Sequence, residues 1–351
     1  MIIDRLHLYR YEIPLARTLR IGSRTLGTRS GLILILTDEQ GFSGAGDIAP
    51  LPGLHRETIP DCIRQLHELK VHQRLDRFTK PDLTDTWAVR LKGPGLFPAV
   101  TFGLQTALLN LIASRAGKRV AALLASDPLR RIPVNALITE EMQADTLSAS
   151  GCTIYKIKAG RRSLKEEIGW IQKIALRLPA GARLRIDANC RWDMDTAVQF
   201  CRAIEDLPVE YIEEPLQDPR ELPALAGKIS FPIALDEHLP AYLGRDLPEW
   251  VGALVIKPAI MPVLDQLGKI GEKGIPVVIS DTFQTGVGIL MLAELAAALG
   301  QQDLAMGFDT LNWLSEDILV DRPVVKNGAL TCRSPVTLND LDLSRLQEME
   351  F

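Results

Sequence analysis

The sequence lacks the features that mark several large classes of protein. Its apolar runs stay short of the roughly 18 residues of a membrane span, and its charged, alternating N-terminus is unlike a signal peptide. The formal net charge is −4, so no general basic field favours a nucleic-acid partner. No G-x-G-x-x-G or G-x-x-x-x-G-K-S/T motif follows a predicted strand, which weakens a nucleotide-binding interpretation.

Cysteine and histidine are also scarce. The five cysteines are an odd number without C-x-x-C spacing, and histidines do not cluster with them. We therefore expect reduced thiols in a cytoplasmic protein. His238 lies in a predicted loop without an obvious partner, and we interpret it as structural rather than catalytic.

The first third of the chain predicts a small antiparallel sheet with two helices. Residues 2–14 alternate apolar and polar, which is typical of a half-buried strand, and two further strands are predicted at 31–37 and 42–47. The polar, glycine-bearing segment 18–28 predicts a mobile loop between the first two strands. Helices are predicted near 57–71 and 100–115, and this region has no βαβ rhythm.

From about Ile132 the pattern changes to strands that alternate with helices. This alternation predicts a parallel sheet, and eight strands favour a closed (β/α)8 barrel over an open doubly wound sheet, which is the main alternative. We predict an α+β capping domain over residues 1–125, joined by 322–351, and a barrel domain over 126–321. The predicted barrel strands are Val134–Leu137, Ile154–Lys158, Leu184–Asp187, Tyr211–Glu213, Ile233–Asp236, Leu254–Lys257, Val277–Ser280 and Leu304–Phe308.

Five of these strands end in a charged residue. Lys158, Asp187, Glu213, Asp236 and Lys257 stand 29, 26, 23 and 21 residues apart along the chain. That spacing suits a strand, a loop and a helix, since a (β/α)8 barrel uses ~250 residues for eight units. The carboxyl ends of barrel strands form the mouth where chemistry takes place, so we expect these five side chains around one opening.

The three acids predict a metal site. Carboxylates on neighbouring strands would repel each other unless a cation lies between them, and oxygen ligands without clustered histidine or cysteine favour a hard divalent ion. Mg²⁺ fits because it leaves coordination positions for substrate oxygens. The alternative is that Asp187, Glu213 and Asp236 each cap a helix or form a separate ion pair.

The lysines predict proton transfer next to a substrate carboxylate. Lys156 and Lys158 share a strand face, and positive charge beside Lys158 would lower its pKa and make it the better base. Lys257 lies across the mouth as a second base or a fixed cation. The alternatives are that Lys156 only pairs with a neighbouring acid and that Lys257 only extends its charge to solvent. Arg185 shares a strand face with Asp187 and is an auxiliary candidate.

The end of the seventh predicted strand offers polar groups. Ser280 and Thr282 could present hydroxyls or backbone N–H groups to substrate oxygens. The alternative interpretation of this segment is a helix N-cap.

The motifs that carry these residues resemble the enolase superfamily, in particular its muconate-lactonizing subgroup. They are K-I-K at 156–158, I-D-A-N at 186–189, I-E-E-P at 212–215, L-D-E at 235–237 and I-K-P at 256–258. The resemblance covers nearly the whole chain. It implies a modified (β/α)7β barrel with an N-terminal cap, Mg²⁺ held by Asp187, Glu213 and Asp236 (Mn²⁺ as a substitute), and Lys158 and Lys257 on either side of the substrate.

Other segments are similar to the o-succinylbenzoate synthase family. They are A-P-L-P-G at 49–53, L-R-I-D-A-N at 184–189 and G-F-D-T-L at 307–311. Because of this similarity, Gly307 is a further auxiliary candidate for the site. This similarity implies a hydro-lyase of menaquinone biosynthesis that acts on a small carboxylate, 2-succinyl-6-hydroxy-2,4-cyclohexadiene-1-carboxylate. Lys158 would take the C1 proton, and Lys257 would stabilise the intermediate. The chain departs from the family at His238, where serine is usual, and at S-D-T-F from Ser280.

Other activities use the same lysine pair. An N-acylamino acid racemase, another epimerase or a cycloisomerase of the superfamily is compatible with lysines on both faces, and a non-catalytic barrel used for binding is a remote alternative. Asp309-Thr310-Leu311 lacks the D-x-D of dipeptide epimerases, and Ser280 stands where mandelate-type chemistry expects histidine. The sequence does not fix the oligomeric state, and a monomer is compatible with it.

Overall fold

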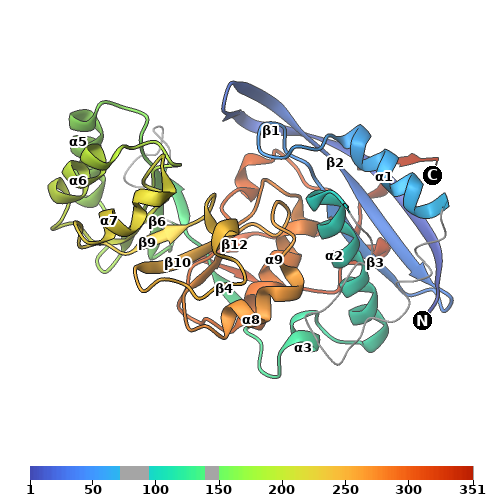
Figure 1. The fold of residues 1–351 in the computed structure, drawn as a ribbon. Coiled ribbons are helices and arrows are strands. Elements are labelled where there is room, and N and C mark those ends of the chain that lie inside the picture. Colours follow the sequence, from blue (N-terminus) through green and yellow to red (C-terminus); the bar gives the residue numbers. More distant parts are fainter. Residues whose placement is uncertain (72–94, 139–149, 351) are drawn as a thin grey trace.

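A four-stranded antiparallel sheet and a curled parallel sheet form the two parts of the fold (Figure 1). The computed structural model describes residues 1–71, 95–138 and 150–350. Both termini lie on the side of the antiparallel sheet, and the barrel helices α5, α6 and α7 lie at the opposite end of the molecule.

The antiparallel sheet has the strand order β14-β1-β2-β3. β1 is Ile3–Ile21, β2 is Arg24–Asp38, β3 is Ser43–Ile48 and β14 is Gln347–Met349, while α1 is Ile59–Val71 and α2 is Pro98–Ala116. The helix α2 packs on β3 so closely that glycine is required there. A Cβ at Gly46 would lie 1.9 Å from the carbonyl oxygen of Gly103.

The predicted mobile loop at 18–28 is wrong. β1 and β2 continue as a hairpin through this segment, with Leu19 opposite Leu26 and Ile21 opposite Arg24, and Gly22 has a φ of 56° in the turn. Gly22-Ser23 is a two-residue connection of the kind that favours a tight hairpin. A polar strand flanking such a turn looks like a loop when only its hydrophobicity is considered.

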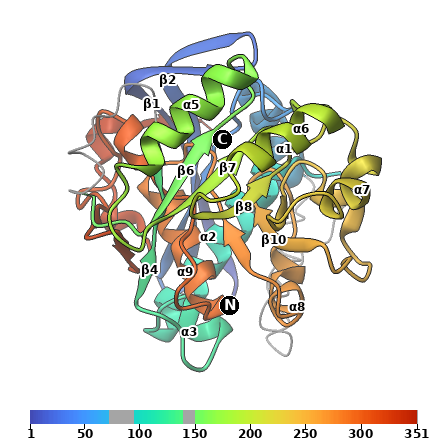
Figure 2. The same cartoon turned by 90° about the vertical axis from the view of Figure 1, so that its left-hand side faces the viewer.

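The parallel sheet follows the chain order from β5 to β11. Its strands are β5 (Ala136–Ile138), β6 (Ile154–Lys158), β7 (Arg183–Asp187), β8 (Val209–Glu213), β9 (Ile233–Leu235), β10 (Val251–Ile256) and β11 (Val277–Ile279). Two isolated parallel bridges, Ser280 to Gly307 and Val134 to Met306, put the predicted eighth strand between the two ends of the sheet. The predicted modified barrel is therefore confirmed, and the open sheet is excluded. Figure 2 shows the neighbouring strands β6, β7 and β8 from the side of the helices α5, α6 and α7.

Helices cover the outside of this sheet. They are α5 (Leu164–Ala175), α6 (Met194–Ala203), α7 (Leu222–Ala226), α8 (Leu267–Gly271) and α9 (Gly286–Leu299), and the short helix α3 (Ala121–Leu124) contacts α9. Ser163 and Glu166 form a capping box at the start of α5. α9 is buried along nearly its whole length because it packs against both β11 of the barrel and β3 of the antiparallel sheet.

Short 3₁₀ helices complete the connections. They are Pro219–Glu221, Leu239–Tyr242, Leu264–Gln266, Leu311–Trp313, Leu338–Asp340 and Leu343–Arg345.

The C-terminal segment returns to both sheets. The hairpin of β12 (Val325–Lys326) and β13 (Ala329–Thr331) pairs with β4 (Arg131–Pro133), whereas β14 pairs with β1. Within the segment 322–351 that we expected to join the capping domain, only β14 pairs with the antiparallel sheet, whereas the hairpin of β12 and β13 lies against β4. The division into domains at residues 125 and 126 stays a prediction.

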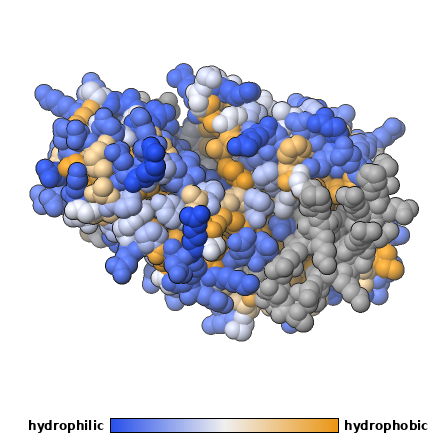
Figure 3. Space-filling model, in the orientation of Figure 1, coloured by the Kyte–Doolittle hydropathy of each residue, from blue (hydrophilic) through white to orange (hydrophobic). Residues whose placement is uncertain are grey.

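The surface of the described part of the chain is mainly hydrophilic in the view of Figure 3, with hydrophobic atoms in separate patches. Among the described residues, no helix has the length and apolarity needed to cross a bilayer. The five cysteines are free thiols, as predicted, and only Cys190 is not buried.

Candidate active site

Three acidic side chains meet at the carboxyl ends of neighbouring strands. Lys158, Asp187 and Glu213 stand side by side at the ends of β6, β7 and β8, and Asp236 follows the last residue of β9. The three acidic residues are almost completely buried. The strand register thus brings the predicted metal ligands to one end of the barrel.

Lys156 lies between two of these acids. Its Nζ is 2.7 Å from both carboxylate oxygens of Glu213 and 2.9 Å from Oδ2 of Asp187. Burial lowers the pKa of Lys156, but the charges of Asp187 and Glu213 outweigh burial and hold that pKa well above its ordinary value. Burial raises the pKa of Asp187, but the surrounding lysines outweigh it and lower that pKa to about 2. Lys156 is therefore a fixed cation in an ion pair.

Lys257 is the second paired cation. It directly follows β10, and its Nζ contacts Oδ2 of Asp236. Burial lowers the pKa of Lys257, but the charges of Asp236 and Glu237 outweigh burial and raise it.

Lys158 differs from both. Over the described residues, its ammonium group makes no hydrogen bond or ion pair, although Asp187 is its neighbour on the next strand. Burial is the main reason that the pKa of Lys158 falls below its ordinary value, and the charges of Lys156 and Lys257 add to the effect against the opposing charge of Asp187. The expected tuning by Lys156 is thus a smaller contribution than burial. Of these three lysines, Lys158 loses its proton most easily.

The acid cluster fits a hard divalent cation. Two paired ammonium groups, from Lys156 and Lys257, face three buried carboxylates, so one negative charge has no direct counter-charge. Burial, together with the charge of Asp187, raises the pKa of Glu213 to about 8, and a bound cation would oppose this shift. The donors are all oxygen atoms, which Mg²⁺ and Mn²⁺ prefer.

The two glutamates of the I-E-E-P motif have different tasks. Glu213 faces the acid cluster, whereas Glu214 accepts hydrogen bonds through Oε1 from the backbone N–H groups of Asp236 (2.6 Å) and His238 (2.8 Å). Its Oε2 lies 2.5 Å from Nδ1 of His238. Glu214 therefore fixes the loop that carries Asp236, and His238 has the partner that the sequence did not reveal.

Arg185, an auxiliary candidate, has its contacts away from the acid cluster. Its side chain is completely buried, with Nε 2.6 Å from Oε2 of Glu210 and Nη1 2.6 Å from the carbonyl oxygen of Ala305, and its guanidinium lies over the ring of Tyr211. These partners occupy a deeper layer of the barrel, which we call the floor. Strand alternation gives the face of a side chain but not the level that its tip reaches, so Arg185 shares a face with Asp187 and yet contacts other residues than the acid cluster does.

The auxiliary candidates of the last two barrel segments lie together. Ser280 bridges to Gly307, and a Cβ at Gly307 would lie 2.6 Å from the Ser280 hydroxyl oxygen, so a side chain at this position would displace that hydroxyl. Thr282 is buried, and its hydroxyl has no hydrogen-bond partner in the part of the chain that the structure describes.

The alternative that this segment caps a helix is wrong. α9 begins only at Gly286, and Asp281 holds the turn through its Oδ2, which accepts from the backbone N–H of Phe283 and from the hydroxyl of Thr310.

The N-terminal segment is tied to the barrel loops by a residue that the sequence did not single out. Arg29 is buried and donates to the carbonyl oxygens of Ala49, Pro50 (3.1 Å) and Phe283 (2.7 Å). It thereby joins the A-P-L-P-G segment to the loop after β11. No local pattern marks Arg29, because it stands in a polar stretch that looks exposed.

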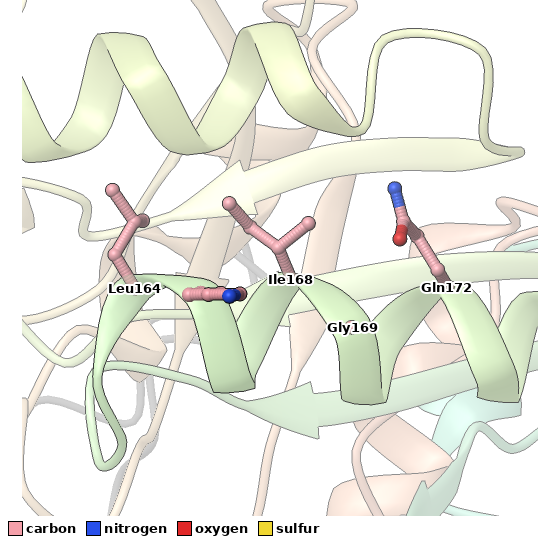
Figure 4. Close-up of a pocket in the computed structure, with 5 residues that line it drawn as sticks. Leu164, Ile168, Gly169 and Gln172 are labelled. Atoms are coloured by element: carbon pink, nitrogen blue, oxygen red, sulfur yellow. The ribbon is translucent and has the colours of Figure 1, made fainter.

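A hollow of about 430 Å³ lies elsewhere, on the outer helical layer (Figure 4). Leu164, Ile168 and Gln172 project from one side of α5, and Gln172 donates to the carbonyl oxygen of Ala203 at the end of α6. The hollow contains none of the charged strand-end residues, so it is separate from the candidate active site.

Comparisons with known proteins agree with the geometry. The family described as "Enolase C-terminal domain-like" matches residues 139–244, and the family described as "MenC, N-terminal domain" matches residues 3–111. The o-succinylbenzoate synthase of Thermobifida fusca is 33% identical over 63% of this chain and 71% of its own length. That of Thermosynechococcus vestitus is 30% identical over 88% of this chain and 93% of its own length.

Solved structures show the same fold. Muconate lactonizing enzyme from Pseudomonas fluorescens, complexed with muconolactone, has a TM-score of 0.80 at 21% identity and covers 98% of both chains. A dipeptide epimerase from Enterococcus faecalis, complexed with Mg and a dipeptide, has a TM-score of 0.78 at 19% identity over 96% of this chain and 99% of its own. The chain thus belongs to the enolase superfamily and, within it, to the o-succinylbenzoate synthase family of hydro-lyase enzymes.

Proposed function

We propose that this protein dehydrates 2-succinyl-6-hydroxy-2,4-cyclohexadiene-1-carboxylate to 2-succinylbenzoate in menaquinone biosynthesis. The observation that carries the proposal is the difference between three lysines at one barrel mouth. Lys156 and Lys257 are ion-paired, and Lys158 is a half-buried amine with a lowered pKa. An amine that is ready to accept a proton beside a cluster of carboxylates suits proton abstraction next to a substrate carboxylate.

The proposal includes a divalent cation, Mg²⁺ with Mn²⁺ as a substitute, held by Asp187, Glu213 and Asp236. The buried all-oxygen donor set supports this assignment, as does the Mg in the related dipeptide epimerase complex. When bound, the ion would neutralise charge that develops on the substrate carboxylate as the neighbouring proton leaves.

Lys158 carries both proton transfers in this proposal. The neutral amine takes the proton from C1, and the electron pair of the C1–H bond moves into the substrate carboxylate to give an anionic intermediate. That electron pair then forms the new ring double bond between C1 and C6 as the bond from C6 to the hydroxyl oxygen breaks. The Lys158 ammonium then returns the proton to the departing hydroxyl, which leaves as water. Because one amine serves both steps, hydrogen and hydroxyl leave from the same face. Aromatisation drives the reaction, so positioning matters more than base strength.

Lys257 acts as a fixed cation on the opposite side of the substrate. β10 lies four places round the ring from β6, counting the segment at Gly307 as the eighth place, so the strand ends that carry the two lysines lie on opposite sides of the mouth. The raised pKa of Lys257 keeps it protonated, and its charge stabilises the anionic intermediate. Ser280, Thr282 and Gly307 are proposed to line the substrate beside it.

The test is a direct assay of aromatisation. Purified protein with Mg²⁺ and the cyclohexadiene substrate should produce growing aromatic absorbance, and chelation of the metal should stop it. N-Succinyl amino acids are assayed in parallel for loss of optical rotation. Absence of aromatisation together with rapid racemisation would replace the proposed dehydration with racemase activity.

Racemisation of N-acylamino acids is the second candidate. The specific observation in its favour is the pair of lysines on opposite sides of the mouth, since a racemase needs a proton donor and a proton acceptor on the two faces. The raised pKa of Lys257 weighs against it, because a firmly protonated lysine is a poor base in the reverse direction.

A further inference from the structure

Three side chains from three successive barrel loops form a cluster beside the acid site. Cys190 follows β7, Glu214 follows β8, and His238 follows β9. The Cys190 sulfur is 3.6 Å from Oε2 of Glu214 and 3.7 Å from Nδ1 of His238, and these two atoms are 2.5 Å apart. The cluster is distinct from the all-oxygen site, because Glu214 points away from Glu213 and towards this side of the loops.

The separations fit a tetrahedral ion bound by sulfur, nitrogen and oxygen. Zinc bonds of about 2.3 Å to sulfur and about 2.0 Å to nitrogen and oxygen give ligand separations of roughly 3.5 Å from sulfur and roughly 3.3 Å between nitrogen and oxygen. Both sulfur distances already match these values. Only Nδ1 of His238 would have to move, by roughly 0.8 Å, and this half-buried side chain stands on a surface loop.

Backbone contacts hold the ligands in place without an ion. The backbone N–H of Cys190 donates to the carbonyl oxygen of Glu214 at 2.7 Å. Oε1 of the fully buried Glu214 is fixed by the N–H groups of Asp236 and His238, which leaves Oε2 directed at the cluster. Cys190 and Glu214 have φ values of 56° and 43°, a conformation that non-glycine residues adopt at an energetic cost and that is often found at functional sites.

We propose that Cys190, Glu214 and His238 form a second cation site, selective for a thiophilic divalent ion of the Zn²⁺ class, with water in the fourth position. A mixed sulfur, nitrogen and oxygen set selects such an ion over Mg²⁺. Cys190 and His238 are only partly buried, which gives the ion a path from solvent. An ion here would tie together the three loops that follow Asp187, Glu213 and Asp236.

Cobalt is a suitable probe because a cobalt–thiolate bond gives a near-ultraviolet charge-transfer band that an all-oxygen site does not. Full-length protein is stripped of metal, saturated with Mg²⁺ to fill the all-oxygen site, and titrated with Co²⁺. The expected result is one equivalent of bound Co²⁺ with the thiolate band, and Zn²⁺ should abolish that band by competition. A titration without the band would overturn the proposal.

Variants assign the ligands. Cys190→Ser should lose the band, and His238→Gln should weaken Co²⁺ binding by roughly tenfold or more. Cys201→Ala, which removes a buried cysteine within α6, is the control and should keep both. A band that persists in Cys190→Ser would contradict the assignment. Circular dichroism establishes whether each variant is folded. If Cys190→Ser does not fold, Co²⁺ binding by His238→Gln decides the outcome. The readout is metal binding, so the result does not depend on the proposed dehydration.

Discussion

Buried charge occurs at two levels of the same barrel, and the two levels are built differently. At the floor, the Arg185 guanidinium meets the carboxylate of Glu210 and neutral oxygen atoms of Asn135 and Ala305. At the mouth, three carboxylates share two paired lysines, and Lys158 stands beside them without a partner among the described residues.

The difference separates a structural use of charge from a chemical one. One cation and one anion at the floor cancel, which limits the desolvation penalty of a buried ion. At the mouth, the carboxylates outnumber the lysines that pair with them. The pKa of Glu213 is raised and the pKa of Lys158 is lowered, and both shifts favour the neutral form of the side chain. Such imbalance is typical of sites that bind an ion or move a proton.

The largest expected effect comes from removing the unpaired amine. Lys158→Ala should reduce kcat/KM for the proposed dehydration by about 10³-fold or more, because the proposed base is lost. Magnesium binding and folding should persist, since Lys158 makes no ion pair with the acids over the described residues. Steady-state assays and Mg²⁺ titration check this, with the exposed Lys165→Ala as the matched control. A variant with near-normal turnover would mean that Lys158 is not the base.

Removing the floor cation should damage stability instead. Arg185→Met leaves the Glu210 carboxylate without its partner and should lower the free energy of unfolding by about 3–5 kcal/mol, while the folded fraction keeps its kcat/KM. Denaturant titration measures this effect. The control is Arg202→Met, which removes an exposed arginine in the last turn of α6 and should change the free energy of unfolding by less than about 0.5 kcal/mol. If Arg185→Met kept its free energy of unfolding but lost kcat/KM, the floor would also take part in the reaction, and the proposed difference between floor and mouth would be contradicted.

Changing one acid of the mouth should weaken ion binding. Asp187→Asn removes one ligand charge and should reduce Mg²⁺ affinity by roughly 10–100-fold. Calorimetric titration compares it with Asp195→Asn, an exposed acid at the start of α6. Equal affinities in the two variants would show that Asp187 does not hold the ion.

The smallest effect is a pH dependence. A lowered pKa means that Lys158 becomes neutral, and therefore basic, at a lower pH than lysine in water. kcat/KM should rise about tenfold per pH unit on the acid side and level off at a pH below 10.5. The same burial disfavours the ammonium form, so the contribution of Lys158 to stability increases as pH rises from its folded to its unfolded pKa. A profile in which kcat/KM levels off only at pH 10.5 or above would contradict the lowered pKa of Lys158.

The sequence predicted the mouth better than the floor. One charged residue per strand end is a local pattern, and the parallel register turns it into a ring, so Asp187, Glu213 and Lys158 could be placed in advance. Arg185 obeys the same alternation but extends to a different level, where Glu210 and Ala305 receive it. The alternation of side chains along a strand does not show at which level of the barrel a long side chain makes its contacts.

Contacts between distant loops could not be predicted either. Cys190, Glu214 and His238 are each 24 residues from the next and meet because backbone hydrogen bonds join their loops. Arg29 contacts Phe283, 254 residues away, and no local motif marks such a pair. Tertiary contacts of this kind depend on the whole barrel being closed.

The most direct test of the central claim replaces the Lys158 amine and then restores it. Lys158→Cys should be inactive, and alkylation with 2-bromoethylamine should rebuild a side chain of lysine length and recover turnover in the aromatisation assay. Wild-type protein treated in the same way controls for the native cysteines, including the partly buried Cys190. Recovered dehydration that depends on the new amine is the predicted result. Full activity in untreated Lys158→Cys, or no recovery after complete alkylation of a folded variant, would contradict the account.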